Sequence, residues 1–177
     1  GAREMHYTRI FFLTLVSAGL VGGAPSRAAV IETSLMASYG KANFSDGYES
    51  TQRRYSASLE FKITPVSGIQ FEYTDSRTNT SYDARIGALL PPIRVHTSYR
   101  DKVYSFNWVQ NLVPAKWLVQ PYVKFGGGRM RRVYIQEIPS EGIKDIITQN
   151  VTTGVGGVGI RIFLLRNLAV KTEFNTY

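Results

Sequence analysis

The stretch Tyr55–Ile63 constrains the fold of this chain most strongly, because apolar and polar residues alternate strictly along it. Its odd-numbered positions are apolar, and its even-numbered positions, from Ser56 to Lys62, are polar or charged. Side chains of a β-strand point alternately to opposite faces, so this pattern predicts a strand with one apolar and one polar face. Turn residues fill Thr64–Gly68, and Ile69–Thr74 then repeats the alternation. The two stretches together predict a β-hairpin.

Similar alternation, separated by turn residues, recurs along the rest of the chain. Seven strands are predicted, over Ile31–Gly40, Tyr55–Ile63, Ile69–Thr74, Lys102–Gln110, Trp117–Arg129, Thr148–Leu164 and Leu168–Thr176. Within the sixth of these, Val151 and Val158 have opposite parity, which predicts a β-bulge at residues 156–157 that adds one residue. Pro121 predicts a second irregularity, because proline lacks the N–H that a β-ladder uses.

Loop lengths distinguish the two architectures that share this alternation. The connections after the first, third and fifth predicted strands are long, chiefly residues 75–100 and 129–147, and the others are short. Short turns at one end and long loops at the other are typical of outer-membrane barrels, whose apolar rows face lipid. The predicted fold is therefore all-β, an antiparallel up-and-down transmembrane β-barrel of about eight strands. A soluble periplasmic β-sandwich is the alternative.

The N-terminal residues have the pattern of an export signal. Met5–Arg9 is a short basic start, Ile10–Ala24 is an uncharged and mostly apolar run, and Ala28 follows a small-residue cleavage pattern. Such a run is the core of a secretory signal peptide and is short for a membrane-spanning helix. We therefore expect residues 1–28 to comprise a short upstream remnant and a cleaved signal peptide, and residues 29–177 to form the barrel domain.

In this pattern of strands, loops and terminal aromatic residues, the chain resembles the small OmpA-like and OmpX-like outer-membrane β-barrel proteins of Gram-negative bacteria. The resemblance implies an outer-membrane location. It also implies three partners, namely membrane lipid with lipopolysaccharide, the barrel-assembly machinery and the periplasmic chaperones. Barrels of this kind have an even number of strands. The last strand usually ends in a lipid-facing aromatic residue, whereas Tyr177 lies on the polar row with Lys171 and Glu173. We therefore expect one further strand of about ten residues after Tyr177.

The polar rows supply a candidate network of charges inside the barrel. It comprises Glu60, Lys62, Glu72, Lys124, Arg161, Lys171 and Glu173. Small barrels fill their interior with side chains, and buried charges need partners. We therefore predict a salt-bridged plug that supports the barrel, with a narrow polar path for ions as the alternative.

Basic residues gather near the ends of the predicted strands that lead into the long loops. Six of them are predicted to contact lipopolysaccharide, because arginine pairs well with phosphate; they are Arg53, Arg54, Arg100, Arg129, Arg131 and Arg132. Solubility of exposed loops is the alternative explanation for these charges. The net charge of +8 also raises the question of nucleic acid. The sequence contains no basic helix or known binding motif, so no nucleic-acid partner is predicted.

His96 and Ser98 are the candidate residues for catalysis, with Asp101 as the nearest acid. Some outer-membrane lipid A deacylases resemble this His-x-Ser pair locally. A histidine activates a serine only when a third group orients it, and no matching strand context accompanies this pair. The chain has no cysteine and only two histidines, so no metal site and no cofactor are predicted. We expect a non-enzymatic outer-membrane protein with a structural or surface-interaction role, with a lipid A-modifying barrel enzyme as the alternative.

Overall fold

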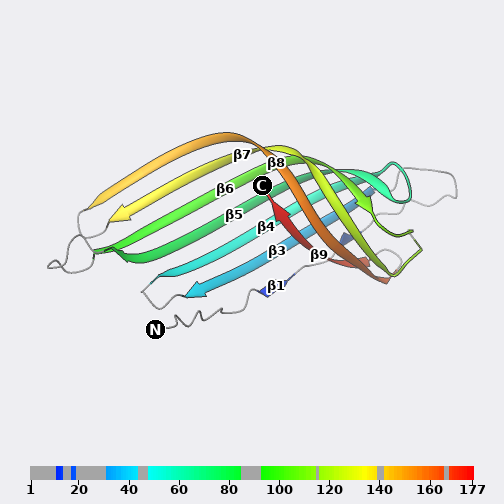
Figure 1. Cartoon of the computed structure of the whole chain (residues 1–177), viewed down its shortest axis with the longest axis horizontal. Coiled ribbons are helices and arrows are strands. Elements are labelled where there is room, and N and C mark those ends of the chain that lie inside the picture. The colour runs from blue at the N-terminus through cyan, green and yellow to red at the C-terminus, as the bar shows by residue number, and fades with distance from the viewer. Residues whose placement is uncertain are drawn as a thin grey trace, which may run out of the picture.

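The computed structural model describes residues 11–13, 17–18, 31–43, 48–84, 93–114, 116–138, 142–165 and 168–177, which form β-strands joined by turns (Figure 1). The strands are β1 (Phe11–Leu13), β2 (Ser17–Ala18), β3 (Ile31–Asn43), β4 (Glu49–Lys62), β5 (Ser67–Ala84), β6 (Ile93–Asn111), β7 (Val119–Ile138), β8 (Ile143–Leu165) and β9 (Leu168–Thr176). In the described part of the chain, no helix is long and apolar enough to cross a membrane.

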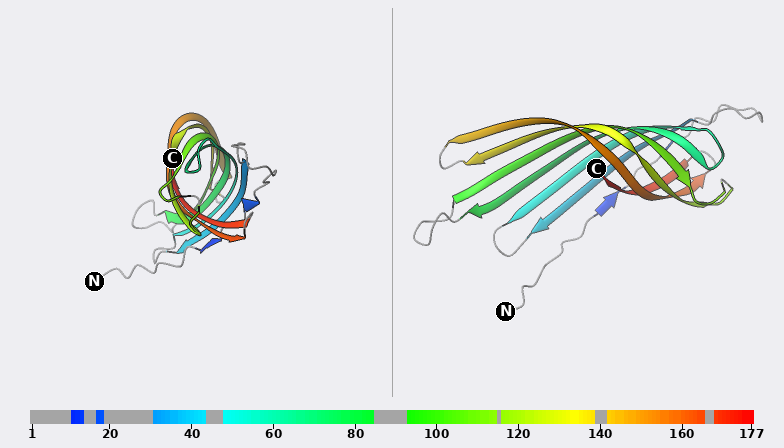
Figure 2. Two further views of the ribbon diagram at one scale, coloured as in Figure 1. Left: turned by 90° about the vertical axis from the view of Figure 1, so that its right-hand side faces the viewer. Right: turned by 45° about the horizontal axis from the view of Figure 1, so that its top comes forward.

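The seven long strands form one antiparallel sheet that curves into a nearly closed barrel. From β3 to β9, each strand is hydrogen-bonded to its neighbours in the sequence, so the chain runs up and down without crossovers. Viewed end-on, the sheet forms an oval ring (Figure 2). The all-β, up-and-down barrel predicted from the sequence is therefore confirmed. The alternative of two packed sheets is wrong.

The two shortest strands lie at opposite edges of this sheet. β1 pairs antiparallel with β3, with Phe11 opposite Tyr39, and β2 pairs antiparallel with β9, with Ser17 opposite Ala169. β2 also lies close to β3. Residues 11–13 and 17–18 therefore lie at the opening between β3 and β9, where an eighth strand of an up-and-down barrel belongs. These residues come from the run that the sequence analysis assigned to a signal peptide.

Several strands are longer than the sequence predicted. β5 continues to Ala84 and β6 starts at Ile93, so most of residues 75–100 is strand. In the same way, β7 and β8 extend through residues 129–147 and leave only a short connection after Ile138. The expected long loops were wrong because apolar alternation marks only the part of a strand that has an apolar face. Backbone pairing continues beyond it into sequence, such as residues 129–138, in which polar and apolar residues no longer alternate.

The two predicted irregularities are absent from their predicted places. Val155 is 4% exposed and Val158 is 57% exposed, so they face opposite sides of a regular strand. The register of β7 with β8 is unbroken there, and the shift occurs between β8 and β9 at Phe163/Leu165. Pro121 keeps a regular register with β8 and lies one residue beyond Tyr122, where the pairing of β7 with β6 ends.

Burial in this barrel is the reverse of that in a water-soluble protein. Among the residues whose burial is described, 18 buried residues are polar or charged and only six are hydrophobic, while 22 large hydrophobic residues are exposed. The exposed ones include Leu35 at 63%, Phe71 at 51% and Phe106 at 49%. The polar rows therefore face the interior, and the apolar rows cover the outside.

Glycines permit close approach of β7 to β6. A Cβ added at Gly126 would lie 2.1 Å from the carbonyl oxygen of Phe106, and one at Gly128 would lie 2.3 Å from that of Tyr104. Both glycines lie within the paired part of β7, and the strand continues beyond them to Ile138.

We predict that Gly126→Ala destabilises the barrel, because the new methyl group meets a backbone carbonyl that the β-ladder holds in place. The expected loss is about 1–3 kcal/mol in the free energy of unfolding, measured by urea titration of detergent-folded protein. Gly154→Ala is the matched control, because a Cβ there has open space around it. Equal stability of the two variants would contradict this account of the glycine.

Candidate functional site

The polar rows of neighbouring strands meet inside the barrel because the sheet register aligns them. Ser58 lies opposite Glu72, and Glu72 lies opposite Ser105 on the next strand. Ser34 and Ser58 share a hydrogen bond, and the Gln70 amide donates to the Ser58 hydroxyl at 3.0 Å. This inward surface is the candidate functional site, and it contains most of the buried charge of the described chain.

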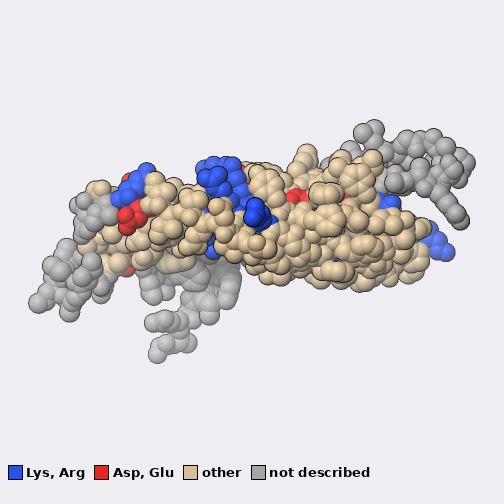
Figure 3. All heavy atoms as spheres, turned by 90° about the horizontal axis from the view of Figure 1, so that it is seen from above, with Lys and Arg blue, Asp and Glu red and all other residues tan. Residues whose placement is uncertain are grey.

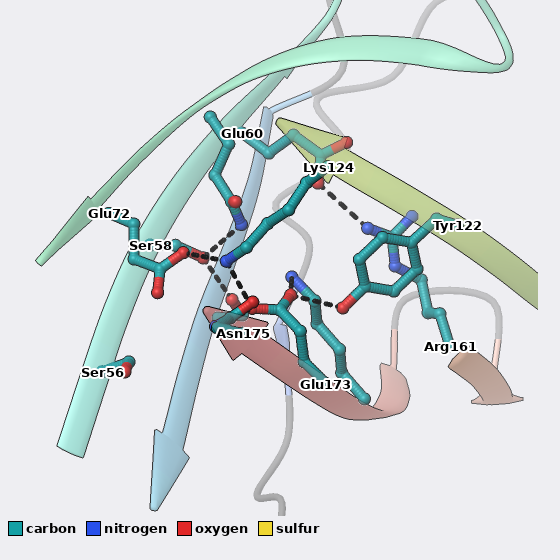
Figure 4. Close-up of polar contacts among 12 residues, drawn as sticks. Ser56, Ser58, Glu60, Glu72, Tyr122, Lys124, Arg161, Glu173 and Asn175 are labelled. Carbon is teal, nitrogen blue, oxygen red and sulfur yellow. Dashed lines mark hydrogen bonds and ion pairs between the residues drawn. The ribbon is translucent and has the colours of Figure 1, made fainter. Parts of the chain in front are cut away.

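Lys124 on β7 occupies the centre of one group of charges. Its ammonium group donates to the carboxylates of Glu72 on β5 and Glu173 on β9 (Figure 4). All three side chains are at most 1% exposed. Glu173 also lies 3.2 Å from the Lys171 ammonium and accepts a hydrogen bond of 2.6 Å from Asn175. Glu173 therefore has three side-chain partners besides Tyr122.

Arg161 on β8 occupies the centre of a second group. Its Nη2 donates to Glu60 on β4 at 2.9 Å, and its Nε lies 3.0 Å from Glu32 on β3. Lys62 also donates to Glu60. The arginine side chain is only 1% exposed, so these carboxylates replace the water that a guanidinium would otherwise bind.

Tyr122 joins the two groups. Its hydroxyl donates to Glu173, and its ring lies 5.4 Å from the Arg161 guanidinium and 5.0 Å from the Lys171 ammonium. A cation over an aromatic face is attracted by the ring quadrupole, and the attraction increases when water is excluded. Gly159 provides space for this ring, because a Cβ there would lie 2.4 Å from it.

All seven charged residues predicted for the interior belong to this network. The sequence did not predict Glu32 or Tyr122 as members of the network, although both lie on polar rows. Glu32 alternates with the outward Ile31 and Thr33, and Tyr122 shares the inward row of β7 with Gln120 and Lys124. With Glu32 included, the network contains four carboxylates and four cations. The set of charges is therefore balanced, as a buried network requires.

Two of the six arginines predicted to contact lipopolysaccharide belong to inward-facing rows. Arg54 lies over the ring of Tyr177 at 5.3 Å, and the Tyr177 hydroxyl lies 3.3 Å from the Thr74 hydroxyl. Arg132 donates to both carboxylate oxygens of Asp101, at 2.7 and 2.8 Å. Neither side chain is on the outer face of the sheet. Arg53, Arg100, Arg129 and Arg131 are on that outer face.

The candidate catalytic residues are not assembled into a nucleophile and its base. His96 Nδ1 lies 2.8 Å from the Ser81 hydroxyl, whereas Ser98 donates to the Asn79 side chain at 2.8 Å. Asp101 is on the opposite face, where it binds Arg132. In the described ranges, no group of three or more His, Cys, Asp or Glu side chains is arranged to hold a metal ion.

Comparison with protein-family models, curated proteins and solved structures finds no match for this chain.

We predict that Lys124→Met destabilises the protein strongly, because it leaves Glu72 and Glu173 buried beside a missing cation. Breaking one side of a buried ion pair costs about 3–5 kcal/mol, which urea titration of the folded protein can measure. Lys62→Met is the control, since Lys62 is 13% exposed and Glu60 keeps Arg161 as a partner. A similar loss in both variants would contradict the central role of Lys124.

Proposed function

We propose that this chain is an integral β-barrel protein of the bacterial outer membrane, with a structural or surface-interaction role and no enzymatic activity. The observation that supports this most strongly is the reversed burial, with a charged interior and an apolar exterior. Exposed apolar surface on this scale is unfavourable in water. In a bilayer the same surface contacts hydrocarbon, and the polar interior stays shielded from lipid.

The outward rows of β4 to β7 support this orientation. From the short-turn end they are mainly apolar as far as Tyr55, Tyr73, Tyr104 and Gly127, and charged residues follow. The rings of Tyr73 and Tyr104 lie 4.9 Å apart, as do those of Phe71 and Phe106. An apolar belt bordered by aromatic residues is the pattern that a membrane and its interface select.

The filled interior supports a closed barrel rather than a pore. Lys124, Arg161, Lys171 and Glu60 are each at most 2% exposed, and the Lys124–Glu72 and Arg161–Glu60 ion pairs cross the lumen. An ion passing this level would have to break several buried ion pairs. We therefore assign the network a supporting role, and the surface-interaction role to the outer face and the loops.

Export supplies the remaining part of the proposal. The N-terminal signal directs secretion, periplasmic chaperones carry the chain, and the barrel-assembly machinery inserts it among membrane lipid and lipopolysaccharide. Removal of residues 1–28 during export would free the edges of β3 and β9 from β1 and β2. Each unpaired backbone group in lipid costs several kcal/mol, so these edges need another antiparallel strand in the membrane.

We predict that Leu59→Arg impairs folding into bilayers, because Leu59 lies on the outward row between Ala57 and Phe61. An arginine at mid-depth on a lipid-facing row costs about 2–4 kcal/mol, and one near the interface costs 0–1 kcal/mol. Thr51→Arg is the matched control, because it lies on the same row of β4 beyond the charged residues. Folding is read as the fraction of protein whose gel migration changes on boiling.

Equal folding of the Leu59 and Thr51 variants would contradict the lipid-facing assignment. A parent protein that stays soluble without detergent and migrates identically before and after boiling would contradict the outer-membrane proposal itself.

We also predict that His96→Ala and Ser98→Ala leave membrane lipids unchanged, because His96 contacts Ser81 whereas Ser98 contacts Asn79, so the two side chains do not form a nucleophile and its base. The measurement is mass spectrometry of lipid A from bacteria that express the parent or either variant. A lipid A species that appears with the parent and disappears with either variant would favour the lipid-modifying enzyme instead.

A further inference from the structure

We propose that the outer face of β4–β7 binds a lipid whose headgroup carries phosphates, and that an acyl chain of this lipid lies in an adjoining apolar hollow. This inference rests on the proposed outer-membrane location. It goes further by naming the surface, its residues and the chemistry of the partner.

The headgroup site is a group of cations on the outward rows, called here the cationic band. It consists of Arg53 on β4, Arg77 on β5, Arg100 and Lys102 on β6, and Arg129 and Arg131 on β7. The sheet register places Arg53 opposite Arg77, Arg77 opposite Arg100, and Lys102 opposite Arg131. Arg77 and Lys102 are additional to the six arginines that the sequence predicted to contact lipopolysaccharide.

The cationic band carries unbalanced charge, unlike the interior. Among the outward-facing residues that lie between these cations in the described strands, Asp75 is the one carboxylate. It forms an ion pair with Arg100 at 2.7 Å. Like charges directly opposite each other on neighbouring strands are destabilising unless another group compensates them. Figure 3 shows Lys and Arg gathered near the middle of one face, beside a stretch that is mainly uncharged and has a few acidic patches. An anionic partner would remove this repulsion.

The apolar hollow lies directly beside the cationic band. Its volume is about 1020 Å³, and most of its lining residues lie on the outward rows of β3 to β8. Ala57 and Gly127 contribute little side-chain volume, while Phe71, Tyr73 and Phe106 contribute aromatic rings. Arg129 also lines the hollow and lies opposite Tyr104, so one arginine belongs to both surfaces.

These two surfaces together fit a phosphorylated lipid better than any other class of partner. A free phosphate would use only the cations, and a neutral lipid would use only the hollow. Arginine binds a phosphate group through two parallel hydrogen bonds. Five of the six cations in the cationic band are arginines and can therefore orient phosphate groups as well as attract them. Neighbouring strands lie about 4.8 Å apart, so cations on four strands span about 14 Å and fit more than one phosphate.

The test uses the full chain folded in neutral detergent and diphosphoryl lipid A as the probe, with the bound fraction measured by native mass spectrometry. The double variant Arg129→Gln with Arg131→Gln should bind the probe about thirtyfold more weakly, at about fivefold for each lost cation. The control, Lys116→Gln with Lys144→Gln, removes equal charge from exposed positions outside the cationic band and should bind like the parent. Arg77→Gln with Lys102→Gln provides a second test should the first variant fail to fold.

Three results would overturn the proposal. They are unchanged binding by the cationic-band variants, equal weakening of the control, and equal binding by the parent of a lipid A analogue without phosphates. Failure of the proposed function is distinguishable, because it appears as a parent protein with no heat-modifiable form in neutral phosphatidylcholine vesicles. That gel-migration assay contains no phosphorylated lipid A, so its result is independent of the binding measurement.

Discussion

The ion pairs across the lumen join strands that are not neighbours in the sheet, and the rest of the structure depends on them. Lys124 on β7 binds carboxylates on β5 and β9, which its own strand does not touch through backbone pairing. Arg161 on β8 binds Glu60 on β4 and Glu32 on β3, on the other side of the barrel opening. The backbone ladder alone leaves the barrel open between β3 and β9, and these charges hold its walls together.

A charged interior also determines what the exterior must be. Buried charges are tolerated only when they are paired, and the buried network meets this condition with four cations and four carboxylates. Since alternate side chains point to opposite faces, every polar residue inside leaves a neighbour outside, such as Leu59 and Phe61 on either side of Glu60. The apolar belt and the polar lumen are therefore two consequences of one alternation. A bilayer is the solvent that suits both.

The parts of the structure that the sequence predicts are those that depend on parity. The strand centres and the seven interior charges follow from the alternation of polar and apolar residues. Whether a position is odd or even also separates Arg54 from Arg53, because Arg54 shares the inward row with Ser56. Grouping basic residues by their place near the loops, rather than by parity, put Arg54 and Arg132 with the outward arginines.

Features that depend on pairing between strands could not be predicted in this way. Ser81 lies next to His96 because the register of β5 with β6 places them opposite each other. That register could not be predicted from the sequence between the two strands. Strand ends were missed where polar and apolar residues no longer alternate, as in residues 129–138 of β7. Residues 11–13 and 17–18 belong to a mostly apolar run with no alternation, so no pattern predicted that the first would pair with β3 and the second with β9.

The most direct test of this account is a single-cysteine scan along residues 56–62, each carrying a fluorophore, in vesicles that contain lipid-borne quencher. The chain has no cysteine of its own, so each label is at one defined position. The account predicts strong quenching at 57, 59 and 61 and weak quenching at 56 and 58, with a period of two residues. Uniform quenching, or none at any position in vesicle-bound protein, would contradict a barrel whose apolar face meets lipid and whose polar face is enclosed.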